Sequence, residues 1–223
     1  MAAIVIGASG GIGRALSDAL ERRGDMVRRL ARGSGDLDLT DQGSIEQAAE
    51  RLAPAAPFDH IIVATGVLHD DELRPERSLR DLHADRLLRS YEINAVGPAL
   101  VARYFLPLLA PAGRFAALSA RVGSISDNRL GGWYGYRASK AALNQLIRSA
   151  AIELARTRPQ ALCVTLHPGT VDTAMSRPFQ RGVSPEKLFS PDHAAERLLA
   201  VLDALTPGDS GFCFDWTGAR IVF

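Results

Sequence analysis

Two side chains, Tyr136 and Lys140, form the arrangement in this sequence with the clearest chemical use. Apolar residues recur at steps of three and four through residues 133–154, which predicts a helix with one buried face. Residues four apart lie on the same side of a helix, so the phenol and the ammonium become neighbours. A free tyrosine titrates near ~10, and a nearby positive charge lowers that pKa. The pair is therefore a candidate for donating and accepting a proton near neutral pH.

Lysine is otherwise rare in this chain. Of the 26 basic residues only Lys140 and Lys187 are lysines, and the other 24 are arginines. Arginine is a wide planar fork, whereas lysine is a compact point charge that can reach a small target. A Tyr-x-x-x-Lys pair taken alone is usually an ordinary surface pair, so the neighbouring motifs have to decide between the two interpretations.

Composition excludes several classes of protein. The 223 residues are 47% hydrophobic, enough for a full core, and the net charge of +1 gives no electrostatic support for binding nucleic acid. No apolar run approaches the length of a transmembrane helix and no signal peptide follows Met1, so we expect no membrane partner. Cys163 and Cys213 lack a metal-binding or redox spacing. We expect a cytoplasmic protein without a metal site.

The elements that must position Tyr136 and Lys140 begin with a glycine-rich turn. Residues 2–6 form a short apolar run, residues 7–13 read GASGGIG, and helix-forming residues follow. A buried strand, a glycine turn and a helix open a dinucleotide-binding fold, in which the turn and the helix N-terminus hold a pyrophosphate. The spacing is G-x-x-x-G-x-G, and the alternative is a tight strand-to-helix turn without a ligand.

The second predicted strand, residues 25–32, bears on the choice of cofactor. An acid near the end of this strand holds a ribose 2′-hydroxyl, whereas an arginine there favours a 2′-phosphate. The strand ends in Ala31-Arg32 and has no acid at that point. This pattern favours NADP(H) over NAD(H), the alternative being that Arg32 is one solvated arginine among many.

The third strand of such a fold has no room in this sequence. Only Gly-Ser-Gly separates Arg32 from residues 36–39, and a parallel crossover needs about a dozen residues. We predict that this strand is vestigial or absent. Asp38 and Leu39 would then cap the adenine from a loop, before a helix over residues 41–52.

The middle of the chain combines a charged segment with an unusual helix. Residues 67–80 are charged and irregular, and His69 with its acidic neighbours has no second cluster at metal-ligand spacing, so we predict a solvated loop. Residues 81–110 are predicted to be one long helix, broken near Gly97-Pro98. Asn94 lies in its interior, where its side chain competes for backbone hydrogen bonds. That conflict suggests a functional role for Asn94.

Strand and helix patterns alternate along the remaining chain, which predicts one α/β domain. Pro168-Gly169 makes a turn after a strand, and Thr170 and Thr173 follow at its carboxyl end, where such folds bind ligands. The other predicted elements are strands at residues 58–66, 113–119, 161–166 and 211–214, a mobile segment at 174–190 and a helix at 191–205.

Taken together, these motifs resemble the short-chain dehydrogenase/reductases. The resemblance covers almost the whole chain, with the motifs in that family's order and spacing: Gly7-x-x-x-Gly11-Ile12-Gly13, Asn94, Tyr136-x-x-x-Lys140 and Pro168-Gly169-x-Val171-x-Thr173. The run GSISDNRLGGWYGYRASKAALN is most similar to the C-factor and sniffer-like carbonyl reductase branch.

The resemblance implies a fold and a set of roles. The fold would be a single doubly wound parallel sheet (Rossmann-like) over residues 1–223, in strand order 3-2-1-4-5-6-7 with strand 3 vestigial or absent. Tyr136 would be the general acid/base, Lys140 would bind the nicotinamide ribose and lower the tyrosine pKa, and Asn94 would hold a water in a proton relay. The segment 174–190 would be a substrate lid. The implied cofactor-binding residues are Gly7, Ser9, Gly11, Ile12, Gly13, Arg32, Asp38, Leu39, Ala64, Gly66, Tyr136, Lys140, Pro168, Gly169, Val171 and Thr173.

Some positions depart from the family pattern. Ile6 replaces the usual threonine before the first glycine, and Val63-Ala64-Thr65-Gly66 replaces the usual Asn-Asn-Ala-Gly. Both positions are mainly structural in the family, so we expect cofactor binding to persist.

The substrate-binding serine is the larger departure. In the family pattern Ser-Ser-x-x-Gly the second serine is catalytic, and its place falls on Ala120. Ser119 would face away, because neighbouring residues of a strand point to opposite faces. Ser124 follows Gly123, where the chain can turn back toward the cleft, so we predict Ser124 as a catalytic residue. The alternative is a loop serine that is bonded to its own backbone.

Two functions follow from the resemblance. The first is an NADP(H)-dependent oxidoreductase that transfers a hydride between nicotinamide and a small carbonyl or alcohol substrate. The second is a cofactor-binding signalling protein of C-factor type that needs little or no turnover. The helices that carry Asn94 and Tyr136 have alanine- and leucine-rich outer faces, and the family pairs these helices between subunits, so we expect a homo-oligomer, and a dimer in particular.

Overall fold

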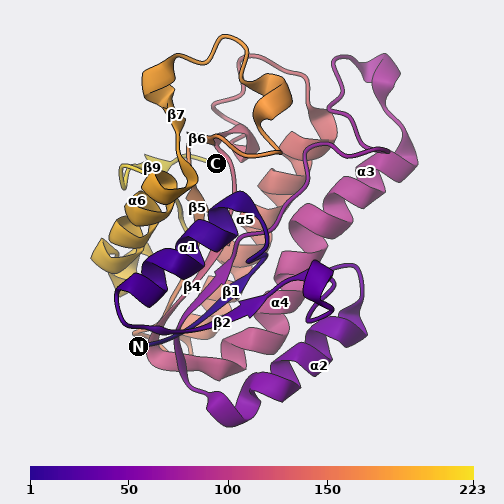
Figure 1. Ribbon diagram of the computed structural model, residues 1–223. Coiled ribbons are helices and arrows are strands. Elements are labelled where there is room, and N and C mark those ends of the chain that lie inside the picture. Colours follow the sequence, from indigo (N-terminus) through magenta and orange to yellow (C-terminus); the bar gives the residue numbers. More distant parts are fainter.

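The computed structural model describes residues 1–223 and arranges them in three layers, with a central sheet between two layers of helices (Figure 1). The sheet has seven strands in the order β2-β1-β3-β4-β5-β8-β9, and all neighbours are parallel except β8 and β9. In chain order these strands are β1 (Ala2–Ile6), β2 (Met26–Leu30), β3 (Phe58–Val63), β4 (Leu109–Leu118), β5 (Leu162–His167), β8 (Cys213–Asp215) and β9 (Arg220–Ile221).

The predicted strand order and the missing third strand are confirmed. After β2 the chain makes a 3₁₀ turn (Arg32–Ser34) and enters a helix that leads directly to β3, so no strand is added beyond β2. One element was not predicted. The tail forms β9, which turns back and pairs antiparallel with β8 at the far edge of the sheet.

The alternation of side chains along the strands divides the core into two clusters. The six helices are α1 (Gly11–Arg22), α2 (Gln42–Leu52), α3 (Ala84–Tyr91), α4 (Gly97–Phe105), α5 (Tyr134–Ala155) and α6 (Pro191–Ala204). Ala3 and Val5 of β1 pack in the cluster that α1 and α6 cover, whereas Ile4 and Ile6 pack in the cluster that α2, α4 and α5 cover. Because both faces are covered, the inner strands β1 and β5 read as nearly continuous apolar runs, AAIVI and LCVTLH.

The helix predicted over residues 81–110 is corrected by the structure. It consists of α3, a π-helical segment (Glu92–Val96) and α4, and β4 already begins at Leu109. Asn94 lies in the π-helical segment and is fully buried. The wider turn of a π-helix accommodates a side chain that would compete with the backbone of an α-helix, and such segments are frequent at functional sites.

The segment between β3 and α3 is irregular and most of its charged side chains are exposed, as predicted for a solvated loop. Three of its residues are nevertheless buried: Leu68, Leu73 and Glu76 have 6%, 5% and 5% of their surface exposed. The segment therefore packs against the body of the protein. It lies at the carboxyl edge of the sheet, together with the short strands β6 (Thr170–Val171) and β7 (Leu188–Phe189), at the top of Figure 1.

Candidate active site

The glycine turn between β1 and α1 is tightly packed. Gly7 has φ +88°, and a Cβ on Gly13 would lie 2.2 Å from the carbonyl oxygen of Gly7, so neither position admits a side chain. A Cβ on Gly11 would lie 2.8 Å from the methyl group of Thr173, which places the turn against the segment after β5. Ser9 is exposed in the same turn. A bare backbone leading into a helix N-terminus suits a pyrophosphate group.

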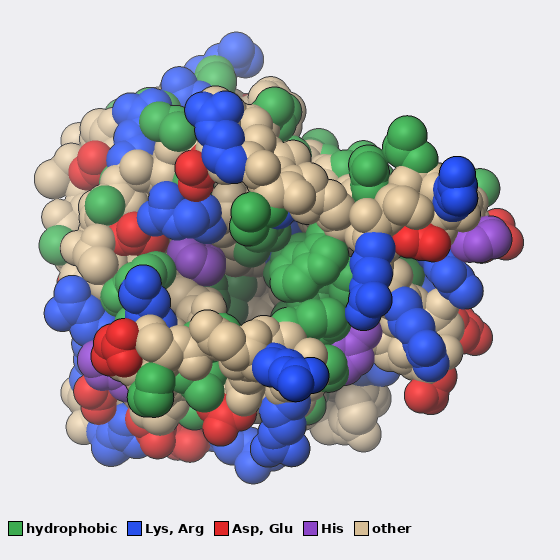
Figure 2. All heavy atoms as spheres, turned by 90° about the horizontal axis from the view of Figure 1, so that it is seen from above, with side chains coloured by type: hydrophobic (Ala, Val, Ile, Leu, Met, Phe, Trp, Pro, Cys, Tyr) green, Lys and Arg blue, Asp and Glu red, His purple; other side chains and the backbone are tan.

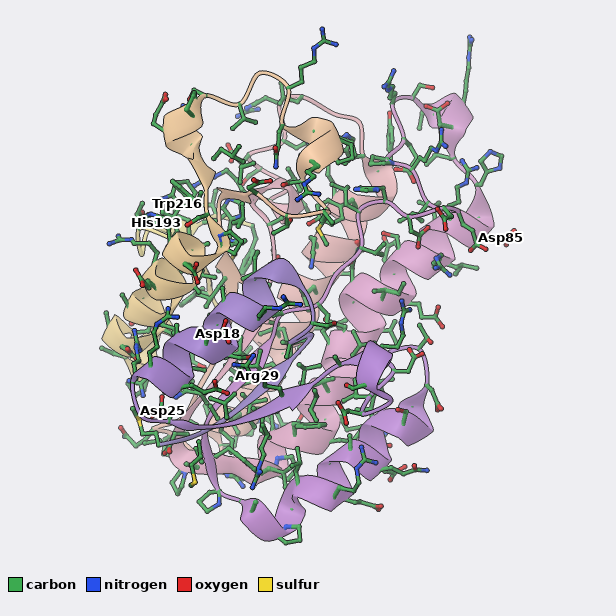
Figure 3. The ribbon with its side chains drawn as sticks, in the orientation of Figure 1. Asp18, Asp25, Arg29, Asp85, His193 and Trp216 are labelled. Carbon is green, nitrogen blue, oxygen red and sulfur yellow. The ribbon has the colours of Figure 1, made fainter.

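Two arginines near the end of β2 differ in their partners. Arg29 is held by Asp18 and Glu21 of α1, and Figure 3 shows Arg29 beside Asp18. Arg32, by contrast, is exposed after the end of the strand and forms no ion pair. Its charge helps to lower the pKa of Asp38, although the larger cause is the Thr40 N–H that donates to that carboxylate. Arg32 is therefore available to a phosphate group.

Leu39, predicted to contact the adenine, is half-buried against the core. A Cβ on Gly97 would lie 2.8 Å from the Cβ of Leu39, so Leu39 packs where the π-helical segment meets α4. Part of its side chain remains accessible beside Asp38. The structure thus brings the predicted adenine-side residues to one loop.

Lys140 and Asn94 meet around Gly66. The Lys140 side chain is buried, and its Nζ donates to the carbonyl oxygen of Leu118 at 2.8 Å. A Cβ on Gly66 would lie 3.2 Å from the Asn94 Oδ1 and 3.3 Å from the Lys140 Nζ. Glycine at position 66 therefore leaves room for both polar groups.

Asn94 holds the chain after β3 in place. Its Nδ2 donates to the Val67 carbonyl and its Oδ1 accepts the Val67 N–H, both at 2.8 Å. Nδ2 also lies within hydrogen-bond distance of the Ser139 hydroxyl, at 3.2 Å. These contacts give Asn94 a role in fixing the site, while its predicted water relay stays a prediction.

The tyrosine pKa departs from expectation. Lys140 was predicted to lower it, but burial raises the pKa of Tyr136 to about 12. The Lys140 Nζ lies 5.9 Å from the centre of the Tyr136 ring. Burial also lowers the pKa of Lys140 to about 8. Desolvation of the charged form thus dominates at both groups in the cofactor-free protein.

A cavity of about 570 Å³ opens in front of Tyr136. Figure 2 shows a hollow in the face above the sheet, with hydrophobic side chains on one wall and basic side chains around its rim. The predicted cofactor residues after β5 border the cavity, together with Ile12 of the glycine turn. These lining residues are Ile12, Pro168, Gly169, Val171 and Thr173.

The predicted catalytic serine is not part of this cavity. Ser124 lines a separate cavity, and its hydroxyl accepts the N–H of Asp127 at 3.2 Å. The short turn at residues 121–123 directs Ser124 away from Tyr136, so the prediction for Ser124 is corrected to the alternative of a loop serine bonded to its backbone. The Ser119 hydroxyl donates to the Asn144 Oδ1 at 2.8 Å, although Ser119, which was expected to face away, also lines the Tyr136 cavity. Ala120 lines the Tyr136 cavity.

An aromatic wall beside Tyr136 could not be predicted from the sequence. The ring of Trp133 lies 6.3 Å from that of Tyr136 and 5.1 Å from that of Phe179, edge to face in both cases. Trp133 has φ +51°, and it is the one non-glycine residue of the chain with a positive φ. A left-handed tryptophan costs roughly 1–3 kcal/mol and marks a position that its surroundings determine. Neither this conformation nor the contact with Phe179 has a signal in the sequence.

Contacts hold both ends of the predicted lid, residues 174–190, in place. The parallel strands β6 and β7 pair at its base, and the ring of Phe189 packs against Trp216 and His193, which lie close together in Figure 3. Near the start of the segment, the Nε2 of His69 lies 3.0 Å from the carbonyl oxygen of Met175. The segment therefore covers the cavity while both of its ends are held in place.

The geometry also bears on metal binding and on membrane insertion. No group of three or more histidine, cysteine, aspartate or glutamate side chains is placed to hold a metal ion. None of the helices combines the length and apolar character that a membrane crossing requires.

Known proteins resemble this chain along most of its length. The family described as enoyl-(acyl carrier protein) reductase matches residues 7–203. The chain is 32% identical over 221 residues to 1-hydroxy-2-glutathionyl-2-methyl-3-butene dehydrogenase of Rhodococcus sp. (strain AD45), across 93% of each protein. The chain belongs to the short-chain dehydrogenase/reductase family. Members are oxidoreductases, and the chain is of that type.

The predicted branch of the family is confirmed as well. The chain is 38% identical over 147 residues to C-signal of Myxococcus xanthus, across 65% of this chain and 82% of that protein. A short-chain dehydrogenase/reductase of Burkholderia multivorans with bound NADP superposes with a TM-score of 0.82 at 26% identity, covering 100% of this chain and 99% of that one. The carbonyl reductase Sniffer of D. melanogaster, at 18% identity, shares the fold with a TM-score of 0.81 over 100% of this chain and 99% of that one.

The buried ammonium leads to a prediction about pH. Lys140 titrates at about 8 in the folded protein and at 10.5 when unfolded, so the unfolded state binds the extra proton between these values. The folded state must therefore gain stability as the pH rises from about 8 to 10.5. Lys140→Met removes this group, and we expect the variant to be more stable than the parent at pH 7 by up to about 3 kcal/mol.

The measurement is the free energy of unfolding by denaturant for both cofactor-free proteins at several pH values. The difference should shrink above pH 8, and the matched change at the exposed Lys187, Lys187→Met, should show no such trend. A parent that is more stable than Lys140→Met at pH 7, with a gap independent of pH, would contradict the desolvation of Lys140.

Proposed function

We propose that the protein is an NADP(H)-dependent oxidoreductase that transfers a hydride between nicotinamide and a small carbonyl or alcohol substrate, with Tyr136 as general acid/base. The observation that carries the proposal is the position of Tyr136. Its phenol borders a cavity that the residues after β5 also line, and Lys140 lies behind it. The names of the relatives, a dehydrogenase and carbonyl reductases among them, support the same chemistry.

Several residues of the chain would have distinct roles in the reaction. The bound cofactor supplies or accepts the hydride. The raised pKa keeps the Tyr136 phenol protonated at neutral pH, which is the form that gives a proton to a carbonyl oxygen during reduction. The ammonium of Lys140 would stabilise the phenolate left behind and bind the ribose hydroxyls. Because Ala120 offers no hydroxyl and the Ser119 hydroxyl donates to Asn144, the substrate oxygen would depend on Tyr136 for its hydrogen bond.

The lid completes the proposed site. The segment from Met175 to Val183 borders the cavity, and closing it would exclude water from the reacting groups. The cavity walls combine aromatic and aliphatic side chains, which favours carbonyl compounds with an apolar body. The signalling alternative without turnover is not favoured, although C-signal is a relative.

The cofactor choice can be tested at Arg32. We expect NADPH to bind more tightly than NADH, because Arg32 is free to pair with a 2′-phosphate. Arg32→Asp should lower the affinity for NADPH by roughly ten- to a hundredfold, the cost of a hydrogen bond to a charged group, and spare that for NADH.

Titration of both cofactors by fluorescence measures these affinities. The charge-matched variant Arg156→Asp, at an exposed position near the end of α5, serves as the control. Equal affinities of the parent for NADPH and NADH would refute the assignment to Arg32.

The proton-transfer role can be tested at Tyr136. Tyr136→Phe keeps the ring and removes only the hydroxyl, so turnover should fall by ~10²–10⁴ while NADPH binding stays near that of the parent. Tyr134→Phe is the matched control, since Tyr134 lines the separate cavity beside Ser124. The measurement is NADPH oxidation with a panel of carbonyl compounds. A Tyr136→Phe enzyme that retained the parent's rate would remove Tyr136 from the mechanism.

We also propose a homodimer through the outer faces of α4 and α5. A groove between them is lined by apolar and charged side chains, and Leu146 and Ile152 remain 40% and 50% exposed. Light scattering should give the mass of two 23.9 kDa chains. Leu146→Arg should shift the protein toward monomers, whereas Met26→Arg on the edge strand β2, where Met26 is also exposed, should not. A monomeric parent at micromolar concentration would exclude this dimer.

A cytoplasmic location stays a prediction.

A further inference from the structure

We infer that Glu76 is a positioning residue for the Tyr136 site, because its buried carboxyl group fixes the start of α5 and thereby the orientation of Tyr136 and Trp133. The inference rests on the proposed function for its catalytic consequence. Glu76 is only 5% exposed and lies in the segment between β3 and α3, far from α5 in the sequence. It takes part in no ion pair, so its burial has to be explained by its other contacts.

Glu76 accepts two hydrogen bonds from backbone N–H groups at the start of α5. The carboxyl Oε2 of Glu76 accepts the Gly135 N–H at 3.1 Å, and its main-chain carbonyl accepts the Trp133 N–H at 2.6 Å. The first N–H groups of a helix lack partners within the helix, and α5 has no side-chain cap of its own. A carboxylate is also the group that the positive end of the helix dipole favours. Glu76 therefore acts as the cap of α5 from another part of the chain.

Two glycines leave space for the carboxyl group and the main-chain carbonyl of Glu76. A Cβ on Gly135 would lie 2.9 Å from the Glu76 Oε1, so any larger residue at 135 would displace the carboxyl group. Gly132 has φ +65°, and a Cβ there would lie 3.4 Å from the Glu76 carbonyl oxygen. The two glycines on either side of Trp133 thus leave the space that Glu76 fills.

The contact also explains the conformation of Trp133. A left-handed tryptophan persists only where its surroundings determine it, and the short hydrogen bond from its N–H to Glu76 is the contact that holds its backbone. The indole ring in turn packs on Tyr136 and Phe179. Loss of the Glu76 contacts would therefore move the aromatic wall and the tyrosine together.

The test compares Glu76→Ala with Glu76→Gln, whose amide oxygen can still accept the Gly135 N–H. Glu72→Gln is the control, since Glu72 lies in the same segment with its side chain 75% exposed. A second set carries Trp216→Phe, which leaves Trp133 as the one tryptophan of the chain and makes its fluorescence a direct reporter.

We expect Glu76→Ala to lower kcat by roughly 10²-fold, the effect of a misplaced catalytic group, with the NADPH Kd unchanged within about twofold. Acrylamide should quench Trp133 more strongly in that variant. Glu76→Gln should keep kcat within about tenfold of the parent and the parent's quenching, because the hydrogen bond to Gly135 remains. A role limited to general stability would change neither the Trp133 signal nor kcat at a temperature where the variant is folded.

A double-mutant cycle with Gly135→Ala tests the contact itself. Gly135→Ala should lower kcat in the parent, and it should do so less in the Glu76→Ala background, where the clash with Oε1 is gone. If Glu76→Ala does not fold, Glu76→Gln and Gly135→Ala carry the test through the same two readouts.

Two results would overturn the inference. The first is a folded Glu76→Ala protein with the parent's kcat and the parent's Trp133 quenching. The second is a strictly additive cycle between positions 76 and 135. Failure of the proposed function is distinguishable, because a parent that reduces no carbonyl compound leaves the Trp133 measurement to decide the position of Glu76.

Discussion

The ammonium group of Lys140 is buried without a carboxylate partner, and the other parts of the site are arranged around it. Its one hydrogen bond is to the carbonyl of Leu118 at the end of β4. Taking an ammonium out of water is costly, and this desolvation lowers the pKa of Lys140. The chain holds the group by bringing the ends of two neighbouring strands and the face of α5 together. Glycine at position 66 leaves the remaining space open in front of it.

The elements around Lys140 deviate from regular structure because they hold polar groups in the protein interior. The π-helical segment Glu92–Val96 lets Asn94 turn its amide to Val67, which fixes the chain directly after β3. At the start of α5, Glu76 and the left-handed Trp133 set where Tyr136 lies. Local strain and buried polar groups thus gather at one edge of a sheet whose two faces are otherwise packed with apolar side chains.

Much of the fold and half of the site could be predicted from the sequence, because the signals are local. The glycine turn requires residues without a Cβ, and three residues after Arg32 cannot hold a crossover. Tyr136 and Lys140 are fixed by helical spacing. Glu76 could not be predicted, because its importance comes from a contact with Gly135 that is distant in sequence. The direction of the Tyr136 pKa shift depends on burial, and the orientation of Ser124 on one short turn, and neither can be read from residue types.

We propose that this chain moves a hydride between NADPH and a carbonyl carbon with a proton from Tyr136. The most direct measurement follows NADPH carrying deuterium at the transferable position, in the presence of carbonyl compounds with an apolar body, and analyses the product by mass spectrometry. We expect an alcohol with deuterium on the former carbonyl carbon, formed in step with the loss of NADPH. NADPH that binds to the folded protein, while every carbonyl compound and the label remain unchanged, would contradict the claim.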